Sequence, residues 1–420
     1  MLDFITAILS NPAFILGIIA MVGLIALKKS GSDIIKGTLK TVFGFLILQA
    51  GANIIVNALI PFSSMFTSAF HLSGIVAEDN SLVAAVQKFL GRETALIMVF
   101  SFLINLILAR ITRWKYIFLT GHMMFSFAGT MAIVLDQMGF SGSTLILIGS
   151  LIQGISMVLF PAISQPMVRK VTGNDSVAFG FWGSSLISLS GLVGGVLGDK
   201  SKSCEELKVS KKLDFLKDMS ILMGIVMVCI YIVTALGAGK DIVLKLSNGQ
   251  NIFLFSIIQA LTFVAGILVL LQGVRMFLGE IVPAFKGIGE KIVPGSKPAL
   301  DVPIFYSYSP MAVTIGFLSA MVGGLIVTFI SKFLPVVVLP SVIGLFFMGG
   351  AAGVFGNKAG GRRGAIIAGL FLGFSFSILI ALAYPLVDVT KYGIKGLWFA
   401  SSDAIIVIII MRLVGKLFGI

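Results

Sequence analysis

Long apolar segments without charged residues constrain the fold of this chain more than any other feature. A helix needs about twenty mostly apolar residues to cross a bilayer. Eleven segments are interpreted as such spans, and the charged residues gather between them. The predicted spans lie near Ala13–Leu27, Thr41–Leu59, Thr94–Leu108, Tyr116–Leu135, Thr144–Ile163, Met219–Leu236, Ile252–Leu271, Met311–Ile330, Val336–Val354, Ala365–Leu386 and Gly396–Leu413. The sequence therefore predicts an all-α integral membrane protein with about eleven transmembrane helices.

The distribution of positive charge predicts the orientation of these spans. Cytoplasmic loops of membrane proteins carry an excess of Lys and Arg. With the N-terminus outside, 24 of the 31 basic residues fall in inside loops or at the C-terminal end, and seven fall outside. No basic region precedes the first apolar segment, which argues against a cleaved signal peptide. We expect a multi-pass protein of the bacterial plasma membrane, with its N-terminus outside and its C-terminus in the cytoplasm.

Composition argues against several classes of function. The net charge of +13 comes from short loops, without the basic stripe interleaved with aromatic residues that a nucleic-acid groove needs. The chain has two cysteines and two histidines and no metal-spaced cluster, and it lacks a nucleotide-binding glycine loop followed by Lys-Ser or Lys-Thr. We therefore expect no metal, no cofactor, no nucleic-acid partner and no ATP-driven pump.

One further apolar segment, Val177–Leu197, is flanked by basic residues on both sides. A single crossing there would place one basic cluster outside, so a re-entrant segment fits better, with Phe181–Ser185 or Gly191–Gly195 at its turn. A short glycine-rich span is the alternative. The proline-rich stretch Pro298–Pro310 also predicts a broken helix, directly before a span.

These two irregular segments occupy comparable places in two parts of the chain. Residues 1–200 and 215–390 would each hold five crossings, followed by a final helix in 395–420. An odd number of crossings inverts the second part relative to the first, as in many carriers. The expected architecture is therefore two inverted repeats within one membrane domain.

Ionisable residues inside predicted spans are costly and so are candidates for function. His122 lies several residues into the fourth span and could exchange hydrogen bonds with sugar hydroxyls, or be a structural histidine bonded to a carbonyl. Asp301 could cap a helix that starts near Pro303, and could also bind hydroxyls at a broken helix. Asp403 is interpreted as a simple cap of the last span.

The stretch between the second and third spans contains further polar residues. Asp79 and Asn80 lie in the external segment Pro61–Gly91, which is amphipathic rather than spanning. This segment is either a solvated loop or a lid over an outward-facing cavity. In the second case, Asp79 and Asn80 would contact the substrate.

Several motifs, in order along the chain, resemble the ascorbate-type enzyme IIC family of the phosphoenolpyruvate-dependent sugar phosphotransferase system (PTS). The matching motifs are Ile35–Thr38 with Leu48–Gly51, Thr120–Phe125, Gln272–Phe277 continuing to Pro294-Gly295 and Ala299–Asp301, and Gly353–Asn357. The resemblance implies a homodimer with a V-shaped scaffold domain, a core domain that carries the sugar, and elevator-like alternating access. It also implies separate cytosolic partners, enzymes IIA and IIB.

The resemblance carries over to the substrate site only in part. His122 and Asp301 match family positions that contact ascorbate, whereas Ser126 replaces a glutamine. Phe181 and Trp182 stand where the family has a His-Gln-Gln run. Because aromatic faces suit the C–H faces of sugars, we expect Phe181 or Trp182 to stack on the substrate. The expected substrate is then a neutral sugar or polyol, bound more tightly than ascorbate.

The predicted function is a PTS permease (EIIC) that binds a sugar or sugar acid outside and presents it for phosphorylation by enzyme IIB. No self-contained catalytic site is expected on this chain. An ion-coupled secondary carrier, with His122 or Asp301 as proton site, is the alternative. A phosphorylated, acidic partner would dock on positive residues of the cytoplasmic face, unless their only role is to set topology. The expected docking residues are Lys286, Lys291, Lys297, Arg362 and Arg363.

Overall fold

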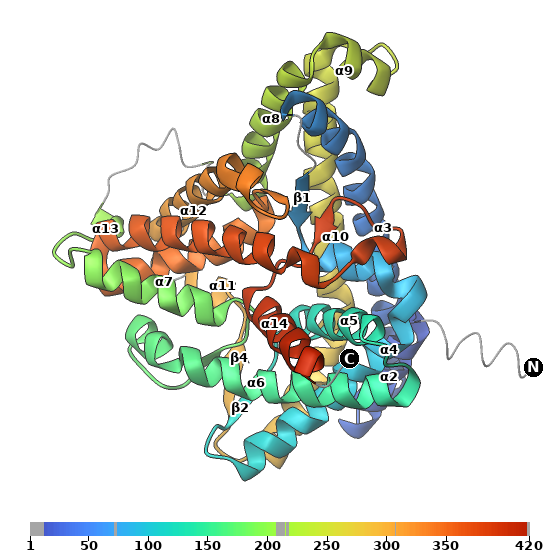
Figure 1. Cartoon of the computed structure of the whole chain (residues 1–420). Helices are drawn as coiled ribbons and strands as arrows, with labels where there is room; N and C mark the ends of the chain where they lie inside the picture. The colour runs from blue at the N-terminus through green and yellow to red at the C-terminus, as the bar shows by residue number, and fades with distance from the viewer. Residues whose placement is uncertain (1–11, 71–73, 207–214, 216–217, 307, 418–420) are drawn as a thin grey trace, which may run out of the picture.

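A computed structural model shows a helical protein with two small parallel β-sheets near its centre (Figure 1). It describes residues 12–70, 74–206, 215, 218–306 and 308–417. The helices are α2 (Pro12–Ala26), α3 (Gly31–Phe70), α4 (Asp79–Ile111), α5 (Gly121–Gln137), α6 (Gly142–Thr172), α7 (Ser184–Leu197), α8 (Met219–Ala238), α9 (Lys240–Leu246), α10 (Ile252–Ile292), α11 (Pro303–Tyr306), α12 (Pro310–Ile330), α13 (Val342–Ala383) and α14 (Ser402–Leu417). Short 3-10 turns are η1 (Cys204–Glu206), η3 (Ser331–Phe333), η4 (Tyr384–Leu386) and η5 (Val389–Tyr392).

The helices form two groups, which meet mainly where α3 and α2 pack against α4, with smaller contacts from α10 to α5 and α4. In the first group, α3 and α10 pack against each other, and α2 and α8 pack beside them. In the second group, α4 packs on α5 and α6, and α13 packs on α7 and α12. Many outward-facing side chains are apolar: Phe329 is 72% exposed and Val196 is 82% exposed. Such a surface is stable in contact with lipid chains rather than water.

Six short strands form two three-stranded parallel sheets. The strands are β1 (Gly74–Ala77), β2 (Tyr116–Phe118), β3 (Ala178–Phe179), β4 (Lys297–Leu300), β5 (Val337–Leu339) and β6 (Leu397–Trp398). One sheet has the order β5-β1-β6 and the other has the order β2-β4-β3. In each sheet, the central strand comes from one part of the chain and both of its neighbours come from the other part. Exchanging β1 with β4, β2 with β5 and β3 with β6 turns one order into the other.

Each strand leads, within a few residues, into the N-terminus of a helix. The turns carry residues that suit helix starts: Glu78 accepts a hydrogen bond from the Ser81 amide (2.5 Å), and Ser341 accepts one from the Gly344 amide (3.2 Å). Because all pairings are parallel, the carboxyl ends of the three strands lie at the same edge of each sheet. The backbone thus brings six helix starts together near two sheet edges.

The number of membrane crossings stays a prediction. Among the described residues, six helices are long and apolar enough to cross a bilayer, or seven if the bent pair α8–α9 counts as one span. Two predicted spans, Val336–Val354 and Ala365–Leu386, lie mostly within the single element α13, which is broken at Gly360 and Gly361. Gly361 has φ +62° and ψ −160°, a conformation that residues with a side chain disfavour, and this explains why a glycine stands at the break. The break lies at the position where the sequence predicted a basic loop between the two spans.

Two local predictions are wrong. Gly191–Gly195, a predicted turn, lies inside α7, and the turn of this segment is instead at residues 180–183. The external segment Pro61–Gly91 is not a solvated loop: it contains the end of α3, strand β1 and the first turns of α4, and Glu78 and Asp79 are each only 5% exposed. α4 is kinked at Leu90, so its first part is a separate short arm.

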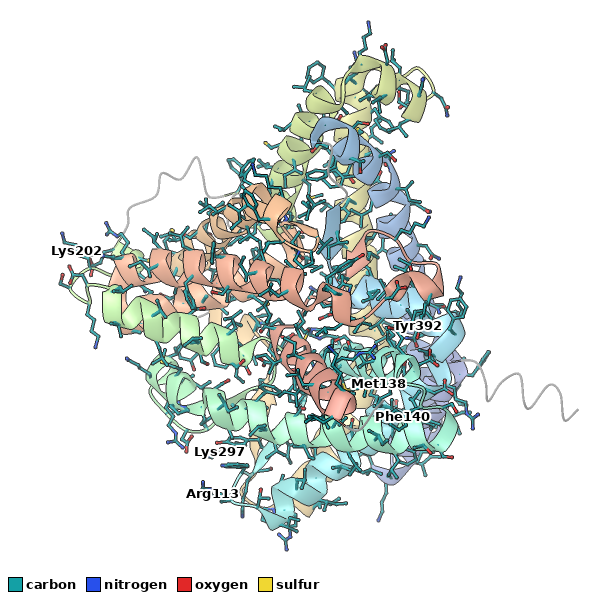
Figure 2. All side chains as sticks on the ribbon, viewed as in Figure 1. Arg113, Met138, Phe140, Lys202, Lys297 and Tyr392 are labelled. Carbon is teal, nitrogen blue, oxygen red and sulfur yellow. The ribbon has the colours of Figure 1, made fainter. Side chains whose placement is uncertain are left out.

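The position of α14 conflicts with the predicted topology. The guanidinium of Arg412 donates to Gln137 (3.4 Å), which in turn exchanges two hydrogen bonds with the Asp388 backbone. The sequence placed Arg412 inside but the stretches around Gln137 and Asp388 outside, so these contacts do not agree with a helix over 396–413 that crosses to the inner face. The side of the membrane on which each of these segments lies stays a prediction. Figure 2 shows Met138, Phe140 and Tyr392 together at one side of the molecule, away from Arg113, Lys202 and Lys297.

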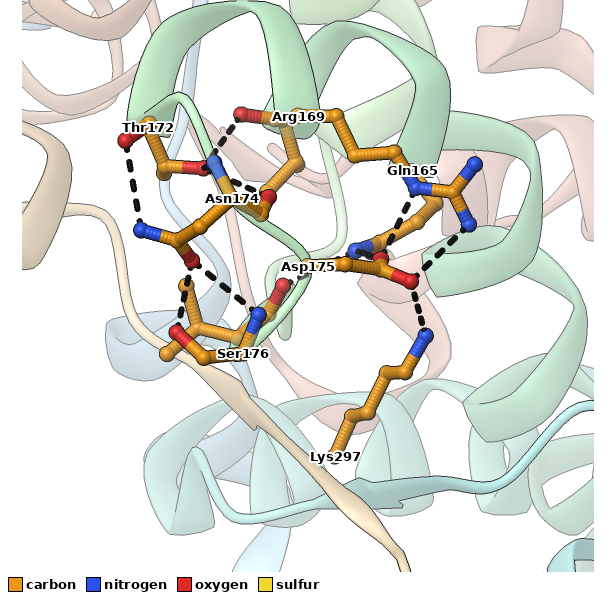
Figure 3. Close-up of polar contacts among 9 residues, drawn as sticks. Gln165, Arg169, Thr172, Asn174, Asp175, Ser176 and Lys297 are labelled. Atoms are coloured by element: carbon orange, nitrogen blue, oxygen red, sulfur yellow. Dashed lines mark hydrogen bonds and ion pairs between the residues drawn. The ribbon is translucent and has the colours of Figure 1, made fainter.

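A polar cluster holds the end of α6 against β4 (Figure 3). Asp175 accepts hydrogen bonds from Arg169 (2.8 Å) and Gln165 (2.8 Å) and forms an ion pair with Lys297. Arg169, then Lys297 and Gln165, hold the pKa of Asp175 well below its usual range. The carboxylate therefore stays charged, and the cluster intact, until the pH falls far below neutral.

Candidate functional site

A polar cavity of about 440 Å³ lies between the two helix groups, where the six strand ends converge. The turns after all six strands contribute to its wall, and α10 closes the opposite side with Leu271 and Arg275. The residues with polar side chains in this wall are Glu78, Asp79, His122, Arg275, Asp301, Tyr306, Ser341 and Ser401. A second cavity of about 390 Å³, between α3, α8 and α12, is lined almost entirely by apolar side chains and lacks the chemistry to bind a sugar.

His122 and Asp301, 179 residues apart in sequence, face each other in this cavity. The His122 Nε2 atom lies 3.7 Å from Asp301 Oδ2, slightly beyond hydrogen-bond distance. Both side chains are partly accessible, at 20% and 31%. Asp301 Oδ1 accepts from the Val302 amide (2.7 Å), which orients Oδ2 toward the histidine. A ligand hydroxyl could therefore donate to Asp301 and contact the imidazole at the same time.

Asp79 also lines the cavity, but its carboxylate is already engaged. Its oxygens accept from the Ala400 amide (2.7 Å) and from the Ser401 hydroxyl, both in the turn between β6 and α14. Asp79 thus lines the cavity, but its carboxylate has little remaining capacity to bind a ligand. The side chain of Asn80 lies outside the described residues.

Arg275 brings a positive charge to the cavity from the other helix group. Its side chain is exposed and lines the cavity from α10. Within the described ranges, Arg275 has no hydrogen bond or ion pair, while the carboxylates of Glu78 and Asp79 are held by helix-start amides. An unpaired guanidinium at a sugar-sized cavity favours a ligand that carries a carboxylate or an enolate.

The two aromatic residues of the 180–183 turn have different environments. Phe181 lines the cavity. Trp182 is completely buried: it stacks on Phe118 (ring centroids 4.5 Å apart), and its indole donates to the Met123 carbonyl (2.6 Å). Stacking of Trp182 on a substrate is therefore excluded in this structure, and only Phe181 remains as the predicted aromatic contact.

Ser126 does not reach the cavity either. It lies one turn after His122 on α5, is 1% exposed, and donates to the Met123 carbonyl (3.2 Å). The predicted role of Ser126 in substrate binding is thus not supported, although the resemblance aligned it with a ligand-binding position.

Of the five predicted docking residues, the structure describes the side chains of Lys297, Arg362 and Arg363. Lys297 is paired with Asp175, and the Arg362 backbone amide donates to the Lys202 carbonyl (2.6 Å) while its side chain is half-buried. Arg363 is exposed. The side chains of Lys286 and Lys291 lie outside the described residues. Among the three docking candidates with described side chains, Arg363 is the exposed one, and the docking surface stays a prediction.

Sequence reasoning missed Arg275, Ser341 and Ser401 as cavity residues. A signal for the two serines was present: each follows a short apolar run, and Ser-rich turns before helices are typical helix starts. Arg275 entered the charge count and lies in the family motif Gln272–Phe277, but neither use pointed to a cavity. Among the described residues, no group of three or more His, Cys, Asp and Glu side chains could hold a metal ion.

Comparison with known proteins gives a consistent assignment. The family model described as "PTS system sugar-specific permease component" matches residues 7–403. The chain is also 29% identical to a protein of Mycoplasma pneumoniae described as "Ascorbate-specific PTS system EIIC component". That alignment covers 89% of this chain and 65% of the relative, so the chain spans less than two thirds of the relative's length. The chain belongs to the family of sugar-specific permease components of the phosphotransferase system.

Proposed function

We propose that this protein binds a sugar acid in the cavity of His122 and Asp301 and moves it inward for phosphorylation by a separate enzyme IIB. The observation that carries this proposal is the meeting of His122 and Asp301 at a cavity between two helix groups. The exposed guanidinium of Arg275 favours an anionic sugar over the neutral one expected from the aromatic pair. The ascorbate specificity named for the relative agrees with this choice.

The interleaved strand order supports two inverted repeats. Residues before α8 contribute β1, β2 and β3, and residues after it contribute β4, β5 and β6, with equivalent positions in the two sheets. We infer that α7 and α14 are equivalent half-helices. Each belongs to a segment that enters the membrane and returns to the face from which it came, and the two segments lie at opposite faces. This arrangement gives each repeat five crossings and makes α14 re-entrant instead of an eleventh span.

Cavity walls from two helix groups suit alternating access. The first group, α2, α3, α8 and α10, would be the scaffold, and the second group would be the moving core that carries His122 and Asp301. Movement of the core along α10 would separate the site from Arg275, so the ligand would lose its counter-charge near the end of the movement. A homodimer formed through the scaffold is part of this proposal.

The membrane topology can be tested with single cysteines in a background that lacks Cys204 and Cys229. We expect Asn248→Cys and Lys416→Cys to react with an impermeant maleimide added to intact cells. Lys202→Cys should react only in inverted vesicles, because it lies in the loop predicted to be cytoplasmic. All three positions are exposed in the structure. Labelling of Lys416→Cys from the cytoplasmic side only would contradict a re-entrant α14.

Coupling to phosphorylation can be tested in inverted membrane vesicles. A phosphorylated product carries about 1.5 to 2 negative charges near neutral pH, so it would neither recross the bilayer nor fit the site that released it. We expect phosphorylation of L-ascorbate to require phosphoenolpyruvate, the general phosphotransfer proteins and enzyme IIB, and to survive a protonophore. Accumulation of unmodified substrate that a protonophore abolishes would instead establish the ion-coupled carrier.

A further inference from the structure

Asp403 is a buried carboxylate that joins the starts of two helices. It is the second residue of α14 and is completely buried. Its oxygens accept from the hydroxyls of Ser184 (3.1 Å) and Ser185, at the first turn of α7. The sequence interpretation made Asp403 a cap of its own helix, whereas the structure shows that it caps a neighbouring one. A buried carboxylate held by several donors is costly to disturb.

Asp79 has the same relationship to α14 that Asp403 has to α7. As the first residue of α4, it accepts from the Ala400 amide and the Ser401 hydroxyl, just before α14 begins. The two carboxylates therefore connect three helix starts in series, from α4 to α14 and from α14 to α7. Each places its negative charge at the N-terminus of the next helix, where the helix dipole favours it.

The series continues from α7 to the start of α5. The Asp403 amide donates to the Trp182 carbonyl (3.3 Å), and the Trp182 indole donates to the Met123 carbonyl (2.6 Å). Met123 is the residue after His122 and lines the cavity with it. We call the hydrogen-bonded residues Asp79, Ser401, Asp403, Ser185, Trp182 and Met123 the carboxylate belt.

The belt connects the two β-sheets at the edges that form the cavity. Asp79 follows β1 and Ser401 follows β6, both in one sheet, while Trp182 follows β3 and Met123 follows β2 in the other. His122 thus sits in a wall whose position relative to the first sheet depends on Asp403. The backbone joins Ser401 to Asp403 through Ser402, and hydrogen bonds make the other links of the belt. Paired polar groups in a buried network rigidify the structure around them.

We propose that Asp79 and Asp403 are positioning residues that fix the cavity wall carrying His122, and that they do not themselves bind the substrate. This inference rests on the proposed function for the identity of the ligand. Asp403 does not line the cavity, and both oxygens of Asp79 are already hydrogen-bonded. The carboxylate belt thereby affects the affinity of the site of His122 and Asp301 for its ligand.

Trp182 supplies a readout of the belt that needs no ligand. The protein has three tryptophans, so labelling with 5-fluorotryptophan gives three ¹⁹F signals, of which Trp182→Phe identifies one. Asp403→Asn keeps the shape of the side chain but turns an amide NH₂ toward the serine hydroxyls. We expect this variant to shift the Trp182 signal and leave that of Trp114 in place. Asp388→Asn makes the same chemical change at an exposed cap of η5, outside the belt, and should move neither signal.

Function is then measured with L-ascorbate as the probe. We expect Asp403→Asn to raise the KM for phosphorylation about tenfold, the effect of one lost buried hydrogen bond of about 1.4 kcal/mol, with kcat changed much less. Ser185→Ala removes one donor and should give smaller shifts in both measurements, so it replaces Asp403→Asn if that variant does not fold. An unmoved Trp182 signal, or an unchanged KM beside a moved signal, would overturn the positioning role. If the wild-type protein does not bind L-ascorbate, the substrate proposal fails, and the Trp182 signal still decides whether the belt exists.

Discussion

Replacing either His122 or Asp301 by alanine is expected to weaken substrate binding by about ten- to hundredfold. Each replacement leaves a ligand hydroxyl without its partner in a partly enclosed site, at a cost of roughly 1–3 kcal/mol. The two residues face each other at 3.7 Å and would contact the same ligand group, so their effects should not add fully in the double variant. Binding of radiolabelled L-ascorbate to the purified protein measures each effect.

Ser126→Ala is the matched control for this experiment. Ser126 lies on the same helix as His122, one turn further along, but it is buried and faces away from the cavity. Its replacement should leave affinity within about twofold of the wild type, because the hydroxyl bonds only to its own helix backbone. Wild-type affinity in the His122→Ala/Asp301→Ala double variant would remove both residues from the site.

The second large effect is expected at Gly353, where α12 and α13 touch. A Cβ atom at Gly353 would lie 2.2 Å from the Ala312 carbonyl oxygen, a backbone atom that no rotamer change can move. Gly353→Leu should therefore force the two helices apart, at or above the ~1–3 kcal/mol usual for an overpacked core. We expect most of this variant to be lost from the monodisperse peak in detergent, with a lower melting temperature in what remains.

Gly279→Leu provides the comparison in a helix of similar length. Gly279 lies in α10, and a Cβ atom there would meet no neighbour within 4 Å among the described residues. This variant should elute and melt like the wild type. Equal behaviour of the two leucine variants would show that α12 and α13 do not pack as closely as the structure has them.

The polar pair of the site could be predicted from the sequence because polar groups in apolar segments are few. His122 and Asp301 stand out against their surroundings, and both lie at breaks in the apolar pattern. Their meeting in one cavity follows from parallel pairing of β2 with β4, which places the ends of the two strands side by side. No local pattern of these three- and four-residue strands reveals such a pairing, since its partners are about 180 residues apart.

Neighbouring residues in a turn show where sequence reasoning stops. Phe181 and Trp182 are both large aromatic residues, and only the three-dimensional course of the turn decides that one faces the cavity and the other the core. Asp403 presents the same difficulty, because a helix-start aspartate usually caps its own helix. The donors that it actually uses come from a segment more than 200 residues earlier. Charge counting alone cannot distinguish a helix that crosses from one that returns, so it could not reveal the contact between Arg412 and Gln137.

The exchange of strands between the two parts of the chain also governs its biosynthesis. β1 pairs only with β5 and β6, and Val337 leaves the ribosome 260 residues after Ala77. Until then, the nascent protein holds the open edges of β1 within or beside the bilayer, where unpaired backbone is costly. Contacts so distant in sequence form late and slowly. A prematurely terminated product therefore contains no finished cavity. Such a product would be an incomplete helix bundle without a pathway through which sugar could leak across the membrane.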